Sequence, residues 1–408
     1  MKALILGFAR HELSVNAMIS KLARREILKE FSASACFPRT VYHRWRWTDF
    51  EFQMHCAVFY NILKYELTTH KTLPAVVVFP SCDQVQLACL ARLVRELKPY
   101  WNPSIVAWLI YPPRLGRSID DPKSFRQYQE YREAFQSLRS ALRDTNNMFL
   151  ACETEALRGI YQVLSAHDVS LIDPPKVTQH GISIGIARVQ ESKIHLVAMG
   201  HASANKGYSL LPDILRQVLK GNPNVKATIH GDIRGTGELG LRKVMASIKH
   251  VGPEVNVLTD TLGTESYYQL LQSADIMLLP YDPRAYADHG SGIYTEATLL
   301  GIPMVVPLGC SFAGASIRER RAVGFAEYSA QSISAAISDA IERLGDLKLN
   351  ATAHANDIGR AESVIDIIVE ESNLAGATDL AISPPVTAWK LTGWIKYNLA
   401  KSLGFLPI

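Results

Sequence analysis

The chain has 408 residues, 48% of them hydrophobic, which is enough for two or three domains with their own buried cores. The formal net charge of +4 is too small to favour nucleic acid as a partner, and the six cysteines contain no C-x-x-C pair that would indicate a zinc site. No stretch reaches the roughly 18 apolar residues that span a bilayer. We therefore expect a cytoplasmic protein, with a peripheral contact at the inner membrane face as the alternative.

The first 178 residues alternate apolar runs with helical patterns, as is typical of an α/β domain. Buried parallel strands are predicted by the apolar runs at 3–6, 75–79, 105–110 and 148–151. After the first run, Val15–Leu28 has the apolar spacing of a helix. We therefore expect an open parallel sheet covered by helices in residues 1–178.

Polar residues follow two of these predicted strands. Arg10 and His11 come after the first strand, and Tyr111 and Arg114 come after the run that ends at residue 110. Because ligands bind at the carboxyl ends of the strands in open α/β sheets, these four residues are candidates for contacts with a substrate. For Arg10 and His11, a surface pair without a function is the alternative.

A long helix is predicted to begin at Asp121-Pro122, because Asp caps helices and Pro favours the first turn. Its apolar face is expected to consist of Phe125, Tyr128, Phe135, Leu138 and Leu142. Upstream, Arg39–Trp47 interleaves basic and aromatic residues, which is compatible with a strand, with a membrane or acceptor contact, or with nucleic acid. No second patch of this kind supports nucleic acid, so we expect none as a partner.

The α/β pattern restarts after a proline-rich segment, and the domain boundary is expected between residues 174 and 190. Ile194–Met199 predicts the first strand of a second domain, residues 190–370. The loop Gly200–Gly207 then leads into a helix. Lys206, at the end of that loop, is suited to neutralise a diphosphate, and a solvated lysine at a helix start is the alternative.

A second glycine-rich loop, Asp288–Gly292, lies between the short apolar runs Ile276–Leu279 and Met304–Val306. It leads directly into the helical segment Ile293–Leu300. The first amides of a helix have no partner within the helix, and the helix dipole adds positive charge there. The loop therefore predicts an anion site that its glycines leave unobstructed.

Glu296 lies about one turn inside this predicted helix, which is too far in for a capping role. A carboxylate at this position suits the hydroxyl groups of a ribose or a sugar next to the anion. The alternative is a capped surface helix with a solvated Glu.

These segments together resemble the donor site of retaining glycosyltransferases that have two Rossmann-like domains facing across a cleft, the GT-B fold. That family carries an acid, seven residues and a Glu before G-x-P-V-V. In this chain Asp288 replaces the usual first Glu, and Glu296 keeps its place before Gly301-Ile-Pro-Met-Val-Val. In the first donor loop Lys206 matches the family's K-G, while His201 stands where an Arg is usual.

The resemblance implies an α/β chain that transfers a sugar from a nucleotide-diphosphate sugar to a glycan, a lipid-linked sugar or a small molecule, as in polysaccharide biosynthesis. Retention of configuration, and neither a metal nor a cofactor, are implied as well. Residues 1–178 would bind the acceptor and residues 190–370 the donor, with Asp288 and Glu296 as catalytic residues. The donor-binding residues would be Gly200, His201, Lys206, Gly207, Gly290, Ser291, Gly292, Ile293 and Glu296.

Other functions are compatible with the same residues. A nucleotide-sugar epimerase or a sugar phosphorylase of this fold is one alternative. A catalytically silent protein that binds a sugar nucleotide is another, because Asp288 and His201 depart from the family pattern.

Residues 371–408 form a tail with a basic amphipathic pattern. Apolar residues recur every four positions at Leu391, Ile395, Leu399 and Leu403, with lysines between them. We expect this tail to be helical and to pack back on residues 1–178, because chains of the resembled fold commonly end in this way. Contact of residues 387–406 with an anionic membrane is the alternative.

Overall fold

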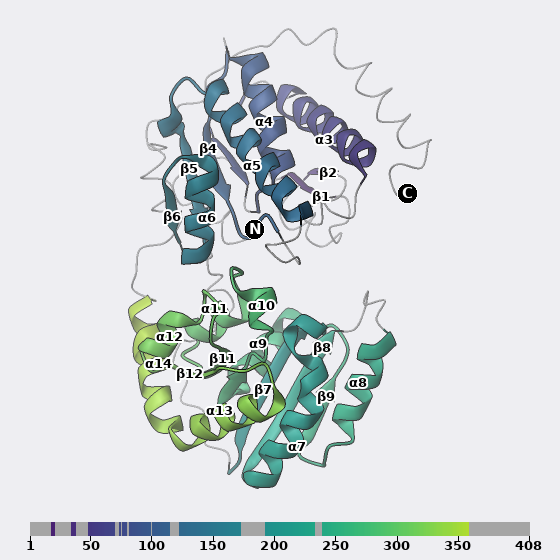
Figure 1. The fold of residues 1–408 in the computed structure, drawn as a ribbon, viewed down its shortest axis with the longest axis vertical. Coiled ribbons are helices and arrows are strands. Elements are labelled where there is room, and N and C mark those ends of the chain that lie inside the picture. Colours follow the sequence, from purple (N-terminus) through teal and green to yellow (C-terminus); the bar gives the residue numbers. More distant parts are fainter. Residues whose placement is uncertain are drawn as a thin grey trace. The chain divides into compact units, whose positions relative to one another are not determined.

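The computed structural model describes residues 18–20, 34–37, 48–172 and 192–358, apart from 70–72, 75, 80, 99, 115–121 and 233–238. The chain divides into two compact units, here called the first unit (described residues up to 172) and the second unit (residues 192–358) (Figure 1). No helix within these ranges is long and apolar enough to cross a bilayer. Arg10, His11, Arg39–Trp47 and the tail lie outside the described residues, so the predictions for them stay predictions.

The first unit begins with a short pair of parallel strands, β1 (Met18–Ser20) and β2 (Ser34–Phe37). The helix predicted over Val15–Leu28 is therefore wrong at Met18–Ser20, which form a strand. A short apolar run fits either period, and pairing with a second strand that is distant in sequence decides between them.

The main sheet of the first unit is parallel, with the strand order β3-β4-β5-β6. Its strands are β3 (Val76–Phe79), β4 (Ser104–Trp108), β5 (Met148–Cys152) and β6 (Val169–Leu171). The helices of this unit are α3 (Asp49–Thr69), α4 (Gln84–Leu97), α5 (Pro122–Ala141) and α6 (Glu155–Ser165). The strands predicted at 75–79, 105–110 and 148–151 are confirmed, with ends shifted by one or two residues.

Helix α5 begins at Pro122, as predicted, and packs mainly against α4. Phe135, Leu138 and Leu142 are buried in the core of the first unit. The predicted stripe is wrong at Phe125, which is 72% exposed. The neighbouring Arg126 is exposed as well and forms an ion pair of 2.6 Å with Asp49 of α3.

The second unit contains a parallel sheet with the strand order β12-β11-β10-β7-β8-β9. Its strands are β7 (Ile194–His201), β8 (Val225–Asp232), β9 (Val255–Leu258), β10 (Ile276–Leu278), β11 (Met304–Pro307) and β12 (Ala322–Phe325). Its helices are α7 (Leu211–Gly221), α8 (Leu239–Lys249), α9 (Thr264–Ser273), α10 (Pro283–Tyr286), α11 (Gly292–Leu299), α12 (Gly314–Arg318), α13 (Ala330–Glu342) and α14 (Leu344–Ile358).

Both faces of this sheet are buried, because alternate residues of each strand enter different cores. In β7, Leu196 and Ala198 pack with helices α7, α8 and α13, whereas Val197 and Met199 pack with α9 and α11 (Figure 1). A strand that is covered on both sides has no polar face. This explains why strands such as β10 and β11 are continuous apolar runs in the sequence.

The strand order of the second unit contains a switch point beside β7. From β7 the chain continues to β8 and β9 on one side, and then crosses to β10, β11 and β12 on the other side. The loops after β7 and β10 therefore leave the sheet side by side at its carboxyl edge. Open α/β sheets bind their ligands at such points.

Candidate functional site

The loop after β7 lies at this switch point and is tightly held. It contains a short 3-10 turn at Ala204–Lys206. The Asp282 amide donates a hydrogen bond to the Asn205 carbonyl, and the Tyr328 hydroxyl donates one to the Ala204 carbonyl, both at 2.9 Å. Segments distant in sequence thus fix the path of the loop.

Two glycines allow the loop to approach its neighbours. Gly207 has φ +73°, and a Cβ there would lie 1.9 Å from the Pro280 carbonyl oxygen. Gly200 has φ +131°, and a Cβ there would lie 2.9 Å from Cδ1 of Ile293 and 3.3 Å from Nζ of Lys206. Gly207 is therefore required because a Cβ would clash with backbone, whereas Gly200 lets the side chains of Lys206 and Ile293 approach the end of β7 closely.

The ammonium group of Lys206 lies against Gly200. Its Nζ lies 5.6 Å from the centre of the Tyr281 ring, a cation–π distance. No carboxylate of the described residues forms an ion pair with Lys206, and burial lowers the pKa of its ammonium group. A partly buried cation without a protein counter-ion is unfavourable by itself and favours the binding of an anion.

Helix α11 begins beside the same glycine, with Ile293 against it. Ser291 caps it, and Ser291 Oγ accepts a hydrogen bond of 3.3 Å from the Tyr294 amide. Among the described residues, no acceptor is hydrogen-bonded to the amides of Gly292 and Ile293. A Cβ on Gly292 would meet no atom within 4 Å, so no side chain or backbone of the described residues crowds this glycine at the helix start.

The Ser291 cap also connects α11 to the residue that follows β10. Its Oγ lies 3.4 Å from the Tyr281 hydroxyl, and the Tyr281 ring is the one beneath Lys206. Tyr281 is buried, and burial raises its pKa to about 12. One aromatic side chain thus contacts both the cation and the helix cap of the candidate anion site.

Glu296 lies one turn further along α11 and is partly buried. Its Oε2 accepts a hydrogen bond from the Tyr267 hydroxyl of α9. Burial raises the pKa of Glu296, and the bond from Tyr267 opposes that rise. The sequence predicted the carboxylate beside the anion site but gave no sign of its tyrosine partner.

Asp288 and Gly290 belong to the loop between α10 and α11. The Ser311 amide donates a hydrogen bond of 2.9 Å to the Ala287 carbonyl and so ties this loop to the segment after β11. Burial raises the pKa of Cys310 to about 12, and the negative charges of Asp282 and Asp288 raise it further, so both carboxylates lie near this thiol. The role predicted for Asp288 stays a prediction.

His201, the last residue of β7, is exposed. It pairs in register with Asp232 at the end of β8, whose carboxylate accepts a hydrogen bond from the Thr261 hydroxyl. His201 therefore stands at the edge of the anion site, with its side chain in solvent. The loop after β8 lies outside the described residues.

The predicted acceptor contacts Tyr111 and Arg114 follow β4, at the expected end of the first sheet. The Tyr111 carbonyl accepts a hydrogen bond of 2.5 Å from the Tyr161 hydroxyl, and burial raises the pKa of the Tyr111 phenol. Arg114 is only 8% exposed. Both side chains are thus already packed within the first unit, and their contact with a substrate stays a prediction.

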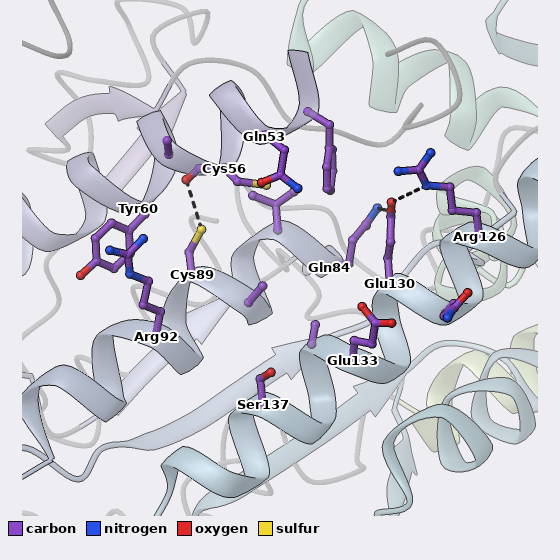
Figure 2. Close-up of a pocket in the computed structure, with 16 residues that line it drawn as sticks. Gln53, Cys56, Tyr60, Gln84, Cys89, Arg92, Arg126, Glu130, Glu133 and Ser137 are labelled. Carbon is purple, nitrogen blue, oxygen red and sulfur yellow. Dashed lines mark hydrogen bonds and ion pairs between the residues drawn. The ribbon is translucent and has the colours of Figure 1, made fainter. Parts of the chain in front are cut away.

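The first unit also contains a groove between α3, α4 and α5, with a cavity volume of about 580 Å³ (Figure 2). None of the predicted site residues lines it. Two of its charged groups are already paired: Glu130 accepts from Gln84 Nε2 at 3.2 Å and forms an ion pair of 3.3 Å with Arg126.

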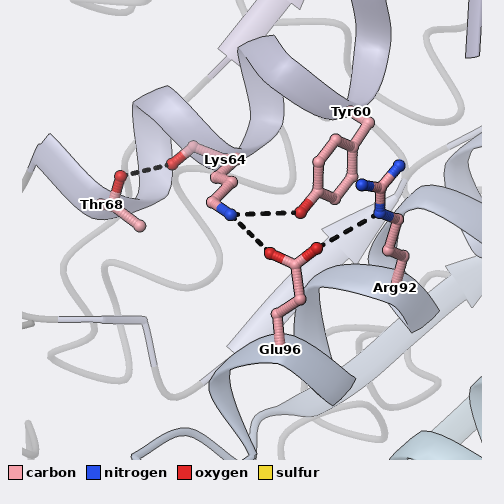
Figure 3. Close-up of polar contacts among 5 residues, drawn as sticks. All are labelled: Tyr60, Lys64, Thr68, Arg92 and Glu96. Atoms are coloured by element: carbon pink, nitrogen blue, oxygen red, sulfur yellow. Dashed lines mark hydrogen bonds and ion pairs between the residues drawn. The ribbon is translucent and has the colours of Figure 1, made fainter. Parts of the chain in front are cut away.

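One end of the groove is closed by a cluster of charges between α3 and α4 (Figure 3). Glu96 pairs with Lys64 at 2.5 Å and with Arg92 at 3.2 Å. The Arg92 guanidinium also lies 4.0 Å from the centre of the Tyr60 ring. Burial raises the pKa of Glu96, but the hydrogen bonds from Lys64 and Tyr60 outweigh it, so the pKa is lowered. This cluster joins two helices.

Comparison with known proteins gives a match in structure only. No family model matches the sequence. No curated protein matches it either.

The solved structures that resemble the chain cover most of its length at low identity. HepE of Anabaena, in complex with UDP and glucose, is 14% identical over 92% of this chain and 96% of its own, with a TM-score of 0.61. A UDP-forming α,α-trehalose-phosphate synthase from Burkholderia vietnamiensis is 11% identical over 86% and 87%, with a TM-score of 0.57.

A nucleotide-sugar epimerase has the same architecture. A putative UDP-N-acetylglucosamine 2-epimerase from Listeria monocytogenes is 12% identical over 95% of both chains, with a TM-score of 0.51. The two parallel α/β sheets and these matches confirm the predicted fold class. The chain therefore has the GT-B fold, which nucleotide-sugar glycosyltransferases share with this epimerase.

Proposed function

We propose that the protein is a glycosyltransferase that uses a nucleotide-diphosphate sugar as its donor. The observation that carries this proposal is that Lys206 and Ile293, at the start of α11, both lie against Gly200, while Lys206 has no carboxylate partner and the amides of Gly292 and Ile293 have no hydrogen-bond acceptor among the described residues. An ammonium group and helix amides together suit a diphosphate, which carries negative charge on both phosphate groups. The fold adds that HepE, with this architecture, is known in complex with UDP and glucose.

In the proposed reaction the bond between the sugar and the diphosphate breaks, and negative charge develops on the leaving diphosphate. Lys206 and the α11 amides would stabilise that charge with groups that are already in place. Such fixed donors would serve the purpose for which other enzymes use a magnesium ion. Transfer with retention of configuration and without a metal is part of the proposal.

The remaining residues of the site divide by their position. Glu296, one turn from the anion site, would accept hydrogen bonds from ribose hydroxyls. Asp288, in the loop before α11, would act on the sugar. His201 would offer a single donor at the edge of the diphosphate site, where its neutral imidazole carries less charge than an arginine.

The first unit is proposed to bind the acceptor. Tyr111 and Arg114, at the carboxyl end of β4, are the described candidates for this contact. Arg10 and His11 are proposed for the same role from the sequence alone. The acceptor would be a glycan, a lipid-linked sugar or a small molecule.

The proposal is tested with the purified protein and a panel of nucleotide sugars. A thermal-shift screen first identifies the donor, because a ligand that binds only the folded state raises the melting temperature. Nucleotide release is then measured with and without candidate acceptors. Release that depends on an acceptor is expected, and Lys206→Ala in the same assay is expected to abolish most of it.

Other outcomes would contradict the proposal. Interconversion of the sugar without an acceptor would identify an epimerase, which the fold also supports. Phosphate-dependent release of a sugar phosphate would identify a phosphorylase. Nucleotide-sugar binding without turnover would identify a silent binding protein.

A further inference from the structure

The hydrogen bond between Tyr267 and Glu296 joins two helices through residues that lie 29 positions apart in sequence. Tyr267 lies on α9, before β10, and Glu296 lies on α11, after it. Neither helix start is involved, so the bond serves no capping role. The backbone of α11 leaves the Glu296 side chain free to rotate, and the hydrogen bond from Tyr267 fixes the position of its carboxylate.

In this pair the tyrosine donates the hydrogen bond and the glutamate accepts it. Burial, and then the charge of Glu296, raise the pKa of Tyr267 far above its usual range, so the phenol stays protonated at every physiological pH. It therefore acts as a donor and occupies Oε2 of Glu296. Within the described residues, Oε1 has no hydrogen-bond partner. One oxygen is thus held by the protein, and the other is available to a ligand.

No cation among the described residues pairs with Glu296, so the Tyr267 hydroxyl is its hydrogen-bond donor there. The titratable groups that face Glu296 are Tyr267 and Tyr268 of α9, and Tyr281 after β10. Helix α14 also packs against α11, but there Lys348 pairs with Asp275 at 2.6 Å and His354 pairs with Glu319 at 3.3 Å. Removal of the Tyr267 hydroxyl would therefore leave a half-buried carboxylate with no donor among the described residues.

We propose that Tyr267 is a positioning residue, which holds the Glu296 carboxylate so that its Oε1 accepts hydrogen bonds from the two neighbouring hydroxyls of a ribose. The proposal rests on the proposed function, because it needs a nucleotide at this site. Two adjacent hydroxyls are the best match for one carboxylate oxygen that is fixed in direction, since both can donate to its two lone pairs. The ligand class is therefore a ribonucleotide, and a deoxyribonucleotide is selected against.

The experiment uses the full chain and calorimetric titration with uridine, adenosine and guanosine diphosphates and their 2′,3′-dideoxy forms. Tyr267→Phe removes the hydroxyl and keeps the ring. Tyr268→Phe is the matched control, because Tyr268 lies next in sequence and senses the charge of Glu296 without a hydrogen bond to it. Thermal unfolding of each variant checks that it is folded.

Wild type is expected to prefer the ribonucleotide, and Tyr267→Phe to reduce that preference roughly tenfold, the size of one hydrogen bond to a charged group. The pH dependence gives a second readout. Glu296 loses its negative charge as the pH falls, and without the hydrogen bond from Tyr267, which lowers the pKa of the carboxyl group, this loss is expected at a higher pH. In the Glu296→Gln background, Tyr267→Phe should have no further effect on either measurement.

Three results would overturn the proposal, and they differ from one another. A Tyr267→Phe profile that coincides with wild type and with Tyr268→Phe would assign the tyrosine to the structure alone. Equal wild-type affinity for ribose and dideoxyribose forms would remove Glu296 from the ribose. Failure of wild type to bind any of the diphosphates would refute the proposed function itself, and this inference with it.

Discussion

Two groups of charged residues, one in each unit, are satisfied to very different degrees. In the first unit, Glu96 has two cationic partners, Lys64 and Arg92. In the second unit, Lys206 has no carboxylate partner among the described residues, and Glu296 is bonded only by a phenol. Burial moves the pKa of Lys206 and that of Glu296 in the direction that disfavours the charged form, whereas the pKa of Glu96 moves in the direction that favours it.

We propose that this difference separates charges that stabilise the fold from charges that bind a ligand. A paired charge offsets its loss of hydration within the protein, so it has little left to offer a ligand. An unpaired, half-buried charge lowers the stability of the ligand-free protein, because its loss of hydration is not offset. A ligand of opposite charge offsets that loss when it binds, so the charge favours binding. The groove between α3, α4 and α5 in the first unit has a cavity volume of about 580 Å³ (Figure 2), but Lys206 and Glu296 lie in the second unit.

The largest effect is expected at Asp288. Asp288→Ala should lower the turnover number about 100-fold or more, as the loss of one group that acts on the reacting centre does, while the affinity for a nucleoside diphosphate stays unchanged. Asp282→Ala is the matched control, because its carboxylate already caps α10 by accepting from the Arg284 amide at 3.0 Å. Steady-state kinetics and calorimetry measure the two quantities. A parallel fall of turnover and affinity would place Asp288 with the nucleotide instead of the sugar.

Lys206→Ala should produce the next largest effect and sharpen the contrast between the units. The affinity for a nucleoside diphosphate is expected to fall about 10- to 100-fold, the range for a hydrogen bond to a charged group, whereas that for the free nucleoside should stay the same. The melting temperature without ligand should not fall, because the variant removes a half-buried, unpaired charge. Equal weakening of both ligands would mean that Lys206 supports the fold and not the anion.

Glu296→Gln is expected to weaken nucleotide binding about tenfold, because an amide accepts hydroxyl protons less strongly than a carboxylate. Its effect on stability should have the opposite sign. Since burial raises the pKa of Glu296, its contribution to the free energy of unfolding is complete below the unfolded pKa and is lost as the pH rises through the folded pKa. Glu296→Gln should therefore stabilise the ligand-free protein at neutral and alkaline pH, with no gain at acidic pH.

Melting curves across this pH range, without nucleotide, measure the stabilisation. Lower stability of Glu296→Gln at alkaline pH would show that Tyr267 more than offsets the cost of burying the carboxylate. The charged group would then be structural, like those of the first unit.

The smallest effect is expected in the first unit. Lys64→Met removes one partner of Glu96 and should lower the free energy of unfolding by about 0.5–1 kcal/mol, the range for a partly exposed ion pair. Because the pKa of Glu96 is lowered in the folded protein, this loss should be present at neutral pH and vanish as the pH falls through the folded pKa. Denaturant titration measures it. A change in nucleotide affinity would contradict the separation of the two kinds of charge.

Much of the secondary structure could be predicted because the strands of both main sheets are buried on two faces. Such strands are short continuous apolar runs, and Gly or Pro ends several of them. The hydrophobic pattern gave a wrong prediction where the same residues fit two structures. Val15–Leu28 has helical spacing, yet Met18–Ser20 pairs as a strand. Phe125 continues the apolar stripe of α5 but is exposed.

The part of the candidate site that lies directly after strands could be predicted from the local sequence. Gly200, Lys206 and the start of α11 follow strands, and the ends of parallel strands meet at one edge of a sheet, so their convergence is predictable. Tyr281 could have been included by the same rule, because it comes directly after β10. Tyr267 could not, since it lies within helix α9, whose sequence contains no motif that indicates a binding site.

The sequence by itself determined the elements and the residue types at the ends of the strands, because both depend on neighbours within about ten positions. The tertiary structure decided which of these groups are satisfied. The Tyr267 hydroxyl reaches Glu296 from another helix, and Tyr328 and Asp282 fix the loop that carries Lys206. Hydrogen bonds and loss of hydration depend on atoms that are adjacent in space and distant in sequence, so only the fold reveals which charges are left for a ligand.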